Sequence, residues 1–464
     1  MKDLTQGSIT GHLLHMSAFL ALSMLVQTLY LLADLFWVGS LGKEAIAAVS
    51  LAGTLMMVVL ALTQTLNVGT TTLISHAAGQ KDQARAQLAF NQSVALSLLV
   101  GGVVAILMFA FRSTYCLSLS ADRTTAELSM GYLRWFIPAL ALQFPMVALA
   151  AALRGTGIVK PTVNVQILSV LLNMVIAPLL IFGVGPFPKM GVAGAALATL
   201  LAILIANVVL ISYFERQFRY LRFCRSQLAP QLKIWWAMLR VGLPAGAEFA
   251  MFFVYTVMVY GIIRRFGPAA QAGFGIGARV MQAIFLPTMA VAFALAPIVG
   301  QNYSGRQPQR VRQSFYSALG VSFTLMLVLT LLCQLVPQRL IWAFSHDGNV
   351  IAFGSEYLRI ISWNFVAVSA VFTASSTFQG LGNTLPPLAS SLSRILLFAL
   401  PAVMLSRRPG FEIRQVWYLS LASVIVQAAA NLWLVHREFR RKLDSLPAEI
   451  TPVNVPQATP VSAE

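Results

Sequence analysis

Long apolar segments separated by short polar ones recur along the whole chain. A membrane-spanning helix needs about 20 predominantly apolar residues, and twelve segments meet this requirement. They lie at residues 13–38, 46–76, 88–111, 128–152, 162–183, 190–213, 237–263, 270–299, 313–336, 352–378, 384–406 and 415–436. The segments are too long for barrel strands and lack a period-2 alternation. The pattern therefore predicts an all-α polytopic membrane protein with twelve transmembrane helices.

Short motifs recur in the two halves of the chain at an offset of 225 residues. Arg154-Gly-Thr-Gly-Ile-Val-Lys-Pro161 corresponds to Gln379-Gly-Leu-Gly-Asn-Thr-Leu-Pro386. The offset spans six predicted helices, so the halves share one topology and form parallel repeats, an arrangement seen in transporters. We expect two six-helix lobes around a central cleft. The expected divisions are an N-terminal lobe at 1–214, a basic cytoplasmic linker at 215–236, a C-terminal lobe at 237–440 and a disordered cytoplasmic tail at 441–464.

Composition and charge support a membrane protein rather than a nucleic-acid-binding one. Of the 464 residues, 58% are hydrophobic and 10% are charged, against about 25% charged in soluble domains. The net charge is +17, but the basic residues lie between apolar segments. With a cytoplasmic N-terminus, the inside segments hold eighteen Lys and Arg residues and the outside loops hold ten. We therefore expect a multi-pass protein of a bacterial-type inner membrane with both termini cytoplasmic and no cleaved signal peptide.

Motifs for enzymatic chemistry are absent from the sequence. It holds no HExxH, no GxSxG and no Walker lysine loop. The three cysteines have no metal-binding or disulfide spacing. We therefore predict a transporter without enzymatic activity, metal or cofactor, driven by an ion gradient.

Asp34 is the sharpest candidate for the coupling site. Helical spacing places Gln27, Tyr30 and Asp34 on one face of the first span. An apolar environment disfavours the charged form of a carboxyl group, so this residue could exchange a proton near neutral pH. The alternative interpretation is a structural ion pair with a buried arginine such as Arg279.

Four further polar residues within the spans are candidates for a polar network or a substrate site. Glu248 follows Pro244 near the start of the seventh span, where it either attracts a cation or caps the helix. Arg279 and Arg394 lie in the second half, and arginine within a bundle more often forms pairs than binds substrate. Asn173, in the fifth span, could join a network in the first half.

The spans carry a set of signatures that together resemble the multidrug and toxic compound extrusion (MATE) transporters. The resemblance covers about residues 10–436, and its first-helix signature is closer to the DinF-like branch than to the NorM-like branch. The matching stretches are Gln27-Thr-Leu-Tyr-Leu-Leu-Ala-Asp-Leu-Phe-Trp-Val-Gly-Ser-Leu-Gly42, Gly69-Thr-Thr-Thr-Leu-Ile-Ser75, Leu153-Arg-Gly-Thr-Gly157, Gly242-Leu-Pro-Ala-Gly-Ala-Glu248, Gly275-Ile-Gly-Ala-Arg279 and Val299-Gly-Gln-Asn-Tyr303.

The resemblance implies two lobes in a V and export of amphipathic, often cationic compounds in exchange for protons or sodium. It assigns cation coupling to Asp34, with Gln27, Tyr30 and Asn173 as polar neighbours. Some relatives have a second carboxylate where this chain has Ala177, which favours a proton over a sodium ion here. Relatives also often have an early proline in the first helix, whereas residues 17–23 contain none.

The leading hypothesis is therefore a monomeric, cation-coupled antiporter for organic cations and drugs, with protons rather than sodium as the expected coupling ion. A flippase for lipids or lipid-linked precursors is the alternative, but it should carry several arginines in its cavity. A passive channel is a third possibility, and the sequence shows no filter-like repeat or ring of charge for it.

Overall fold

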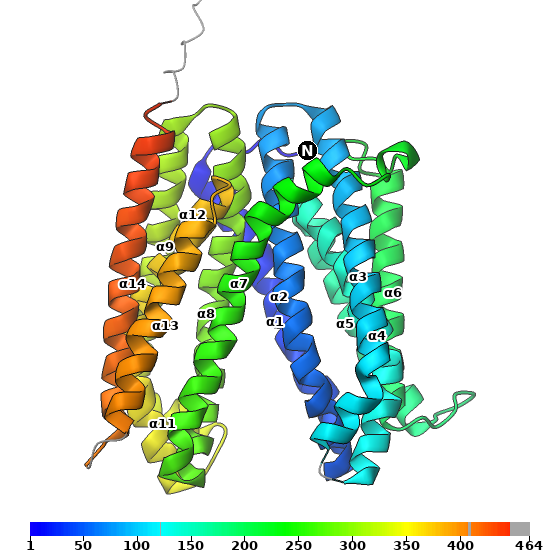
Figure 1. Ribbon diagram of the computed structural model, residues 1–464, viewed down its shortest axis with the longest axis vertical. Helices are drawn as coiled ribbons and strands as arrows, with labels where there is room; N and C mark the ends of the chain where they lie inside the picture. The colour runs from blue at the N-terminus through cyan, green and yellow to red at the C-terminus, as the bar shows by residue number, and fades with distance from the viewer. Residues whose placement is uncertain (121, 407–409, 446–464) are drawn as a thin grey trace, which may run out of the picture.

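The fold consists of long helices that run roughly parallel to one another (Figure 1). The computed structural model describes residues 1–120, 122–406 and 410–445, apart from the side chains of residues 31–35. Within this part of the chain, eleven helices are long and apolar enough to cross a membrane, and a bent pair of helices completes twelve spans. This confirms the predicted fold class.

Six spans form the first half of the chain and the remainder follow a short linker. The first six are α1 (Ile9–Gly39), α2 (Lys43–Gly79), α3 (Gln83–Leu119), α4 (Arg123–Gly155), α5 (Lys160–Phe182) and α6 (Val192–Arg216). The linker contains η1 (Arg225–Gln227). The second half comprises α7 (Leu232–Ile263), η2 (Arg264–Phe266), α8 (Pro268–Ser304), α9 (Pro308–Leu335), α10 (Pro337–Trp342), α11 (Gly348–Ile361), α12 (Asn364–Gly380), α13 (Leu385–Ser406) and α14 (Ile413–Lys442).

The helices separate into two groups that meet at one end and diverge toward the other (Figure 1). We call the group α2–α6 the N-terminal lobe and the group α8–α14 the C-terminal lobe. The end where the lobes meet carries the N-terminus, the linker and the end of α14, and we call it the terminal end. The segments predicted to be cytoplasmic lie at this end as far as the structure describes them, and most of the predicted tail at 441–464 falls outside the described residues.

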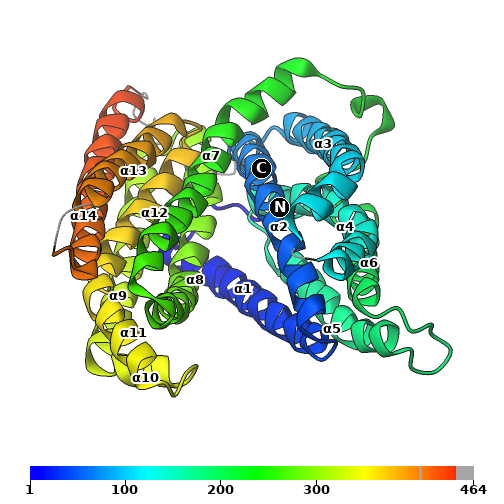
Figure 2. The same ribbon diagram turned by 60° about the horizontal axis from the view of Figure 1, so that its bottom comes forward.

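The first helix of each half contacts both lobes. Leu13 and Met16 of α1 are buried in a cluster with α8 and α9, whereas Val38 belongs to the core of the N-terminal lobe. Accordingly, α1 lies between α8 and α5 in Figure 2. The seventh span does the reverse: Met238 of α7 is buried in the N-terminal core and Val259 in the C-terminal core. The two equivalent helices thus tie the lobes together.

The segment predicted as one helix at 352–378 is divided in the structure, so the prediction of a continuous helix is wrong there. Helices α11 and α12 meet at an angle of 54°. The Ser362 carbonyl at the break accepts a hydrogen bond from the Thr330 hydroxyl at 3.0 Å. Gln334 donates to the Arg359 carbonyl at 2.7 Å. A break at membrane depth is tolerated because side chains of α9 satisfy the freed carbonyl groups.

Candidate functional site

The lobes meet along a closely packed seam at the terminal end. A Cβ atom built on Gly79 would lie 2.2 Å from the Gln301 carbonyl oxygen of α8, and one on Gly242 would lie 2.1 Å from the Thr65 carbonyl oxygen of α2. Only glycine allows backbones to approach so closely, as at other helix interfaces in membranes. The seam therefore includes close backbone contacts from α2 to α8 of the other lobe and to α7, the first helix of the second half.

Two side chains cross the seam in a way that follows the internal repeat. The Nε2 atom of His76 on α2 donates to the Gly380 carbonyl at 2.7 Å. The Nε2 atom of Gln301 on α8 donates to the Gly155 carbonyl at 2.9 Å. The offset of 225 residues relates His76 to Gln301 and Gly155 to Gly380. Each lobe thus supplies one donor to the glycine carbonyl that ends a helix of the other lobe.

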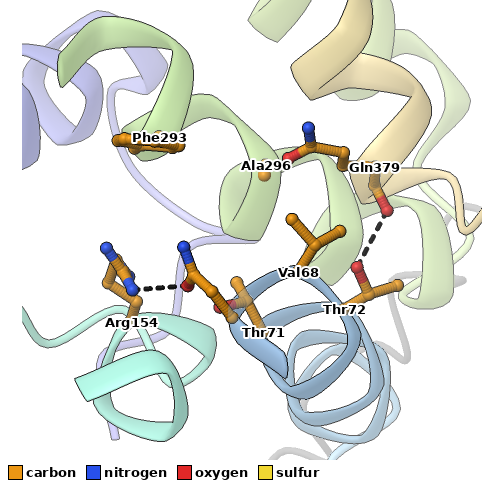
Figure 3. Close-up of a pocket in the computed structure, with 8 residues that line it drawn as sticks. Val68, Thr71, Thr72, Arg154, Phe293, Ala296 and Gln379 are labelled. Carbon is orange, nitrogen blue, oxygen red and sulfur yellow. Dashed lines mark hydrogen bonds between the residues drawn. The ribbon is translucent and has the colours of Figure 1, made fainter. Parts of the chain in front are cut away.

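Arg154 of α4 lies at the seam, where its Nη2 atom donates to Asn67 Oδ1 at 2.5 Å. Its guanidinium carbon lies 6.0 Å from the centre of the Phe293 ring of the other lobe. Figure 3 shows Arg154 and Phe293 near a second contact across the seam, in which the Thr72 hydroxyl donates to the Gln379 carbonyl at 3.0 Å. The cavity among these residues measures about 10 Å³, room for a single water at most. At this point the terminal end is closed to organic solutes.

The predicted coupling residue, Asp34, belongs to α1, but its side chain lies outside the described residues. Its predicted neighbours are described. The Tyr30 hydroxyl lies 3.0 Å from Thr199 Oγ1, and Asn173 Nδ2 donates to the same oxygen at 3.2 Å. The structure thus brings Tyr30 and Asn173 together through Thr199 of α6, a residue that the sequence did not single out. Gln27 is exposed.

Glu248 lies in the middle of α7 and faces polar groups of the C-terminal lobe. Its Oε1 atom accepts a hydrogen bond from the Ser375 hydroxyl of α12 at 2.6 Å and a long one from the Ser391 hydroxyl of α13 at 3.5 Å. Within the described part of the chain, no Lys, Arg or His forms an ion pair with it. These contacts come from neighbouring helices rather than from the start of α7, so Glu248 does not act as a cap for that helix.

Arg394 joins the same cavity without touching Glu248 directly. Its Nη1 atom lies 3.5 Å from Gln427 Oε1, and the Gln427 amide donates to Ser391 Oγ at 3.0 Å. Its guanidinium carbon lies 4.8 Å from the centre of the Tyr255 ring. A chain of polar contacts therefore connects guanidinium and carboxylate through Gln427 and Ser391.

The cavity between these residues measures about 130 Å³ and is lined mainly by apolar and aromatic side chains. Drug-sized ligands occupy pockets of about 300–1,000 Å³, whereas a water molecule occupies about 30 Å³. The cavity therefore suits a small hydrated cation or a few waters better than an organic compound.

Two of the predicted residues stand apart from these clusters. Arg279 is exposed on α8 and does not line the cavity of Glu248. Ala177 is fully buried in the N-terminal core, where a second carboxylate would have no solvent.

The partners of Glu248 were missed because serine and glutamine are common within spans. The pairing of Ser391 and Arg394 one turn apart on α13 is the single signal that could have indicated them.

Twin helical lobes that meet along a seam at one end, built from the eleven single-helix spans and one bent pair of the described chain, are the architecture of a multi-pass membrane transporter. The chain belongs to the MatE family, whose model matches residues 20–179 and again residues 244–404. These two matches follow the internal repeat.

Relatives and solved structures agree with this assignment. The chain is 25% identical to the probable multidrug resistance protein YoeA of Bacillus subtilis, over 87% of this chain and 89% of that protein. It is also 25% identical to an FAD transporter of Shewanella oneidensis, over 87% of this chain and 90% of that one. A solved multidrug resistance MATE family transporter of the MOP superfamily in an outward-facing conformation matches with a TM-score of 0.87 and 24% identity, over 95% of this chain and 98% of that one.

Proposed function

We propose that this protein exports amphipathic, often cationic organic compounds from the cytoplasm of a bacterial cell in exchange for protons. The names of the multidrug resistance relatives support export of drugs. The closed seam and diverging lobes support alternating access, because a second conformer would open the terminal end. The charge bias of the loops supports a cytoplasmic terminal end in the inner membrane, and the first-helix signature supports the DinF-like branch. We propose that the protein acts as a monomer.

The observation that carries the proposal is the environment of Glu248. Two serine hydroxyls and no cationic side chain of the described residues contact this carboxylate. A carboxylate without a fixed counter-ion can bind a proton in this conformer, whose cavity of about 130 Å³ admits a small cation, and a cationic substrate in a conformer with a wider cavity. Ser375 can donate to the charged form and accept from the protonated form, so both states keep a hydrogen bond. Asp34 is proposed to act in the same way in the N-terminal half.

Exchange follows when one carboxylate serves two competing ligands. Protonation from the outer side neutralises the group and weakens its attraction for a cation, which then leaves. Loss of the proton to the cytoplasm restores the charge and the site for the next cation. Each ligand shifts the conformational equilibrium only by its difference in affinity between the two conformers. Sodium is less favoured because Ala177 supplies no second carboxylate in the first lobe.

Transport of lipids or lipid-linked precursors has less support. Such a cargo carries phosphate groups and calls for several arginines in the cavity within the spans. Arg394 is the one arginine among the described residues that line the Glu248 cavity, and the arginines near the terminal end lie outside it.

Drug sensitivity of cells with and without the protein tests the proposal. Expressing cells should tolerate higher concentrations of a cationic dye such as ethidium, and collapse of the proton gradient should remove the difference. Flavin adenine dinucleotide, an anion, is the competing cargo suggested by one relative's name. Gradient-dependent export of this anion without export of the dye would contradict the proposal.

A further inference from the structure

A large basic cavity lies at the terminal end, apart from the sites within the spans. It measures about 660 Å³, within the range of ligand pockets. Its walls come from α2 and α3 of the N-terminal lobe, from the first turns of α7, and from the α12–α13 connection and the end of α14. Four parts of the chain that are far apart in sequence therefore share one cavity beside the seam.

The cavity carries positive charge that the described residues do not neutralise. Five basic side chains line it and no carboxylate does; they are Arg85, Lys233, Arg240, Arg441 and Lys442. The nearby carboxylate of Glu438 pairs with Arg441 at 3.0 Å and with Lys442 at 3.4 Å. The other three basic residues form no ion pair with any described side chain. A multivalent set of exposed cations around a hollow of this size is suited to a phosphate-bearing anion.

The rim of the cavity indicates where this anion comes from. Trp236 and Leu385 line the cavity and are 65% and 59% exposed. Neighbouring Leu232 is 74% exposed. Tryptophan beside Lys and Arg is typical of the membrane–water interface, and basic residues next to a span attract anionic lipids. A free phosphate would make no use of an exposed apolar rim.

We propose that this cavity binds the phosphate headgroup of an anionic phospholipid, with Arg85, Lys233 and Arg240 as the binding residues. The headgroup joins Arg85 of the N-terminal lobe to the start of α7, and Arg441 and Lys442 of the C-terminal lobe line the same cavity. It therefore stabilises the conformer in which the terminal end is closed. This binding is independent of the proposed cargo and coupling ion, so it can be present or absent whatever the protein transports.

Thermal unfolding of the purified full-length protein tests the site. Phosphatidylglycerol should raise the midpoint by about 3–6 °C relative to zwitterionic phosphatidylcholine. The combined change Arg85→Gln, Lys233→Gln and Arg240→Gln should remove this difference. The matched control is Arg216→Gln, Arg219→Gln and Arg225→Gln, which removes the same charge from exposed positions outside the cavity and should keep the full shift. Arg240→Gln alone, which should halve the shift or more, keeps the test valid if the triple variant does not fold.

A distance measurement tests the conformational effect. Spin labels on Ala84→Cys of α3 and Gln309→Cys of α9, with the native cysteines replaced by serine, report the separation of the lobes at the terminal end. Phosphatidylglycerol should increase the population at the short distance, and the cavity triple variant should abolish this increase.

Three outcomes would overturn the proposal. Equal losses in the cavity and control variants would show general surface electrostatics. An identical cavity-dependent shift with millimolar inorganic phosphate alone would assign the site to a small soluble anion. No difference between the two lipids in the wild-type protein would exclude a headgroup site.

Discussion

At the scale of single residues, Glu248 is the carboxylate whose surroundings are best defined. Its position between Ser375 and Ser391, without a described counter-ion, distinguishes it from Glu356, which forms an ion pair with Arg414 far from the seam. In the proposed mechanism Glu248 exchanges ligands, whereas Glu356 is engaged in a local ion pair.

Glu248→Gln should reduce gradient-driven dye efflux by about tenfold or more, because the amide keeps the shape but cannot change its charge. The control Glu356→Gln removes a partly exposed ion pair worth about 0–1 kcal/mol and should leave efflux within about twofold of the wild type. Efflux assays in cells expressing equal amounts of each variant measure both effects. Equal efflux by the two variants would remove Glu248 from the mechanism.

Thr199 is predicted to stabilise the N-terminal lobe, since its hydroxyl joins Tyr30 and Asn173. Thr199→Val leaves the buried Asn173 amide without this acceptor and should cost about 1–3 kcal/mol of unfolding free energy. Thr199→Ser keeps the hydroxyl and should cost less. Thermal unfolding of the two purified variants gives the comparison. A valine variant as stable as the serine variant would show that the contact is dispensable.

The sequence indicated candidate residues but not their partners. Asp34 and Glu248 stand out because carboxylates are costly within apolar spans. Thr199, Ser375 and Gln427 do not, because neutral polar residues are frequent in spans and only tertiary contacts select among them. The role of Asp34 remains a prediction.

At the scale of helices, the seam depends on the absence of side chains at a few positions. Gly242 of α7 approaches the Thr65 carbonyl of α2 too closely for any Cβ atom, whereas Gly261 of the same helix has nothing within 4 Å of that position. Two glycines on one helix thus have different roles.

Gly242→Val should force α7 away from α2 and so destabilise the closed conformer. We expect it to lower the free energy of unfolding by about 1–3 kcal/mol. Gly261→Ala should be neutral or slightly stabilising, because alanine favours helix and meets no neighbour. The distance between spin labels at Ala84→Cys and Gln309→Cys, in a background without native cysteines, should lengthen in the first variant only. An unchanged distance in Gly242→Val would show that the seam tolerates bulk at this position.

Hydropathy predicted the number and order of the spans because spanning length is a local property of the sequence. It did not predict that α1 and α7 contact both lobes, because apolar residues look alike whichever lobe they face. The break between α11 and α12 was also missed. Its cost is offset by Thr330 and Gln334 of another helix, which no local pattern records.

At the scale of the whole molecule, Cys224 reports which side of the membrane the linker faces. The other two cysteines, Cys116 and Cys333, are fully buried, whereas Cys224 is half-buried in the linker. The hydrogen bond with the Ser226 side chain lowers the pKa of the Cys224 thiol, so more thiolate is present at neutral pH.

A membrane-impermeant maleimide should label Cys224 in inverted vesicles but not in intact cells with a permeabilised outer layer. Because the reactive form is the thiolate, the rate should rise with pH until the lowered pKa is passed. Cys224→Ser should abolish the labelling. Labelling of the wild-type protein from outside intact cells would reverse the proposed orientation.

The most direct test of proton-coupled export is dye transport by the purified protein in liposomes under an imposed pH gradient, comparing the wild type with Asp34→Asn. The asparagine fixes position 34 in a neutral form of nearly the same shape. The wild type should accumulate a cationic dye against its concentration gradient only while the pH gradient lasts, and Asp34→Asn should bind lipid and fold normally but fail to accumulate dye. Accumulation by Asp34→Asn at the wild-type rate, or wild-type transport that ignores the pH gradient, would contradict the account.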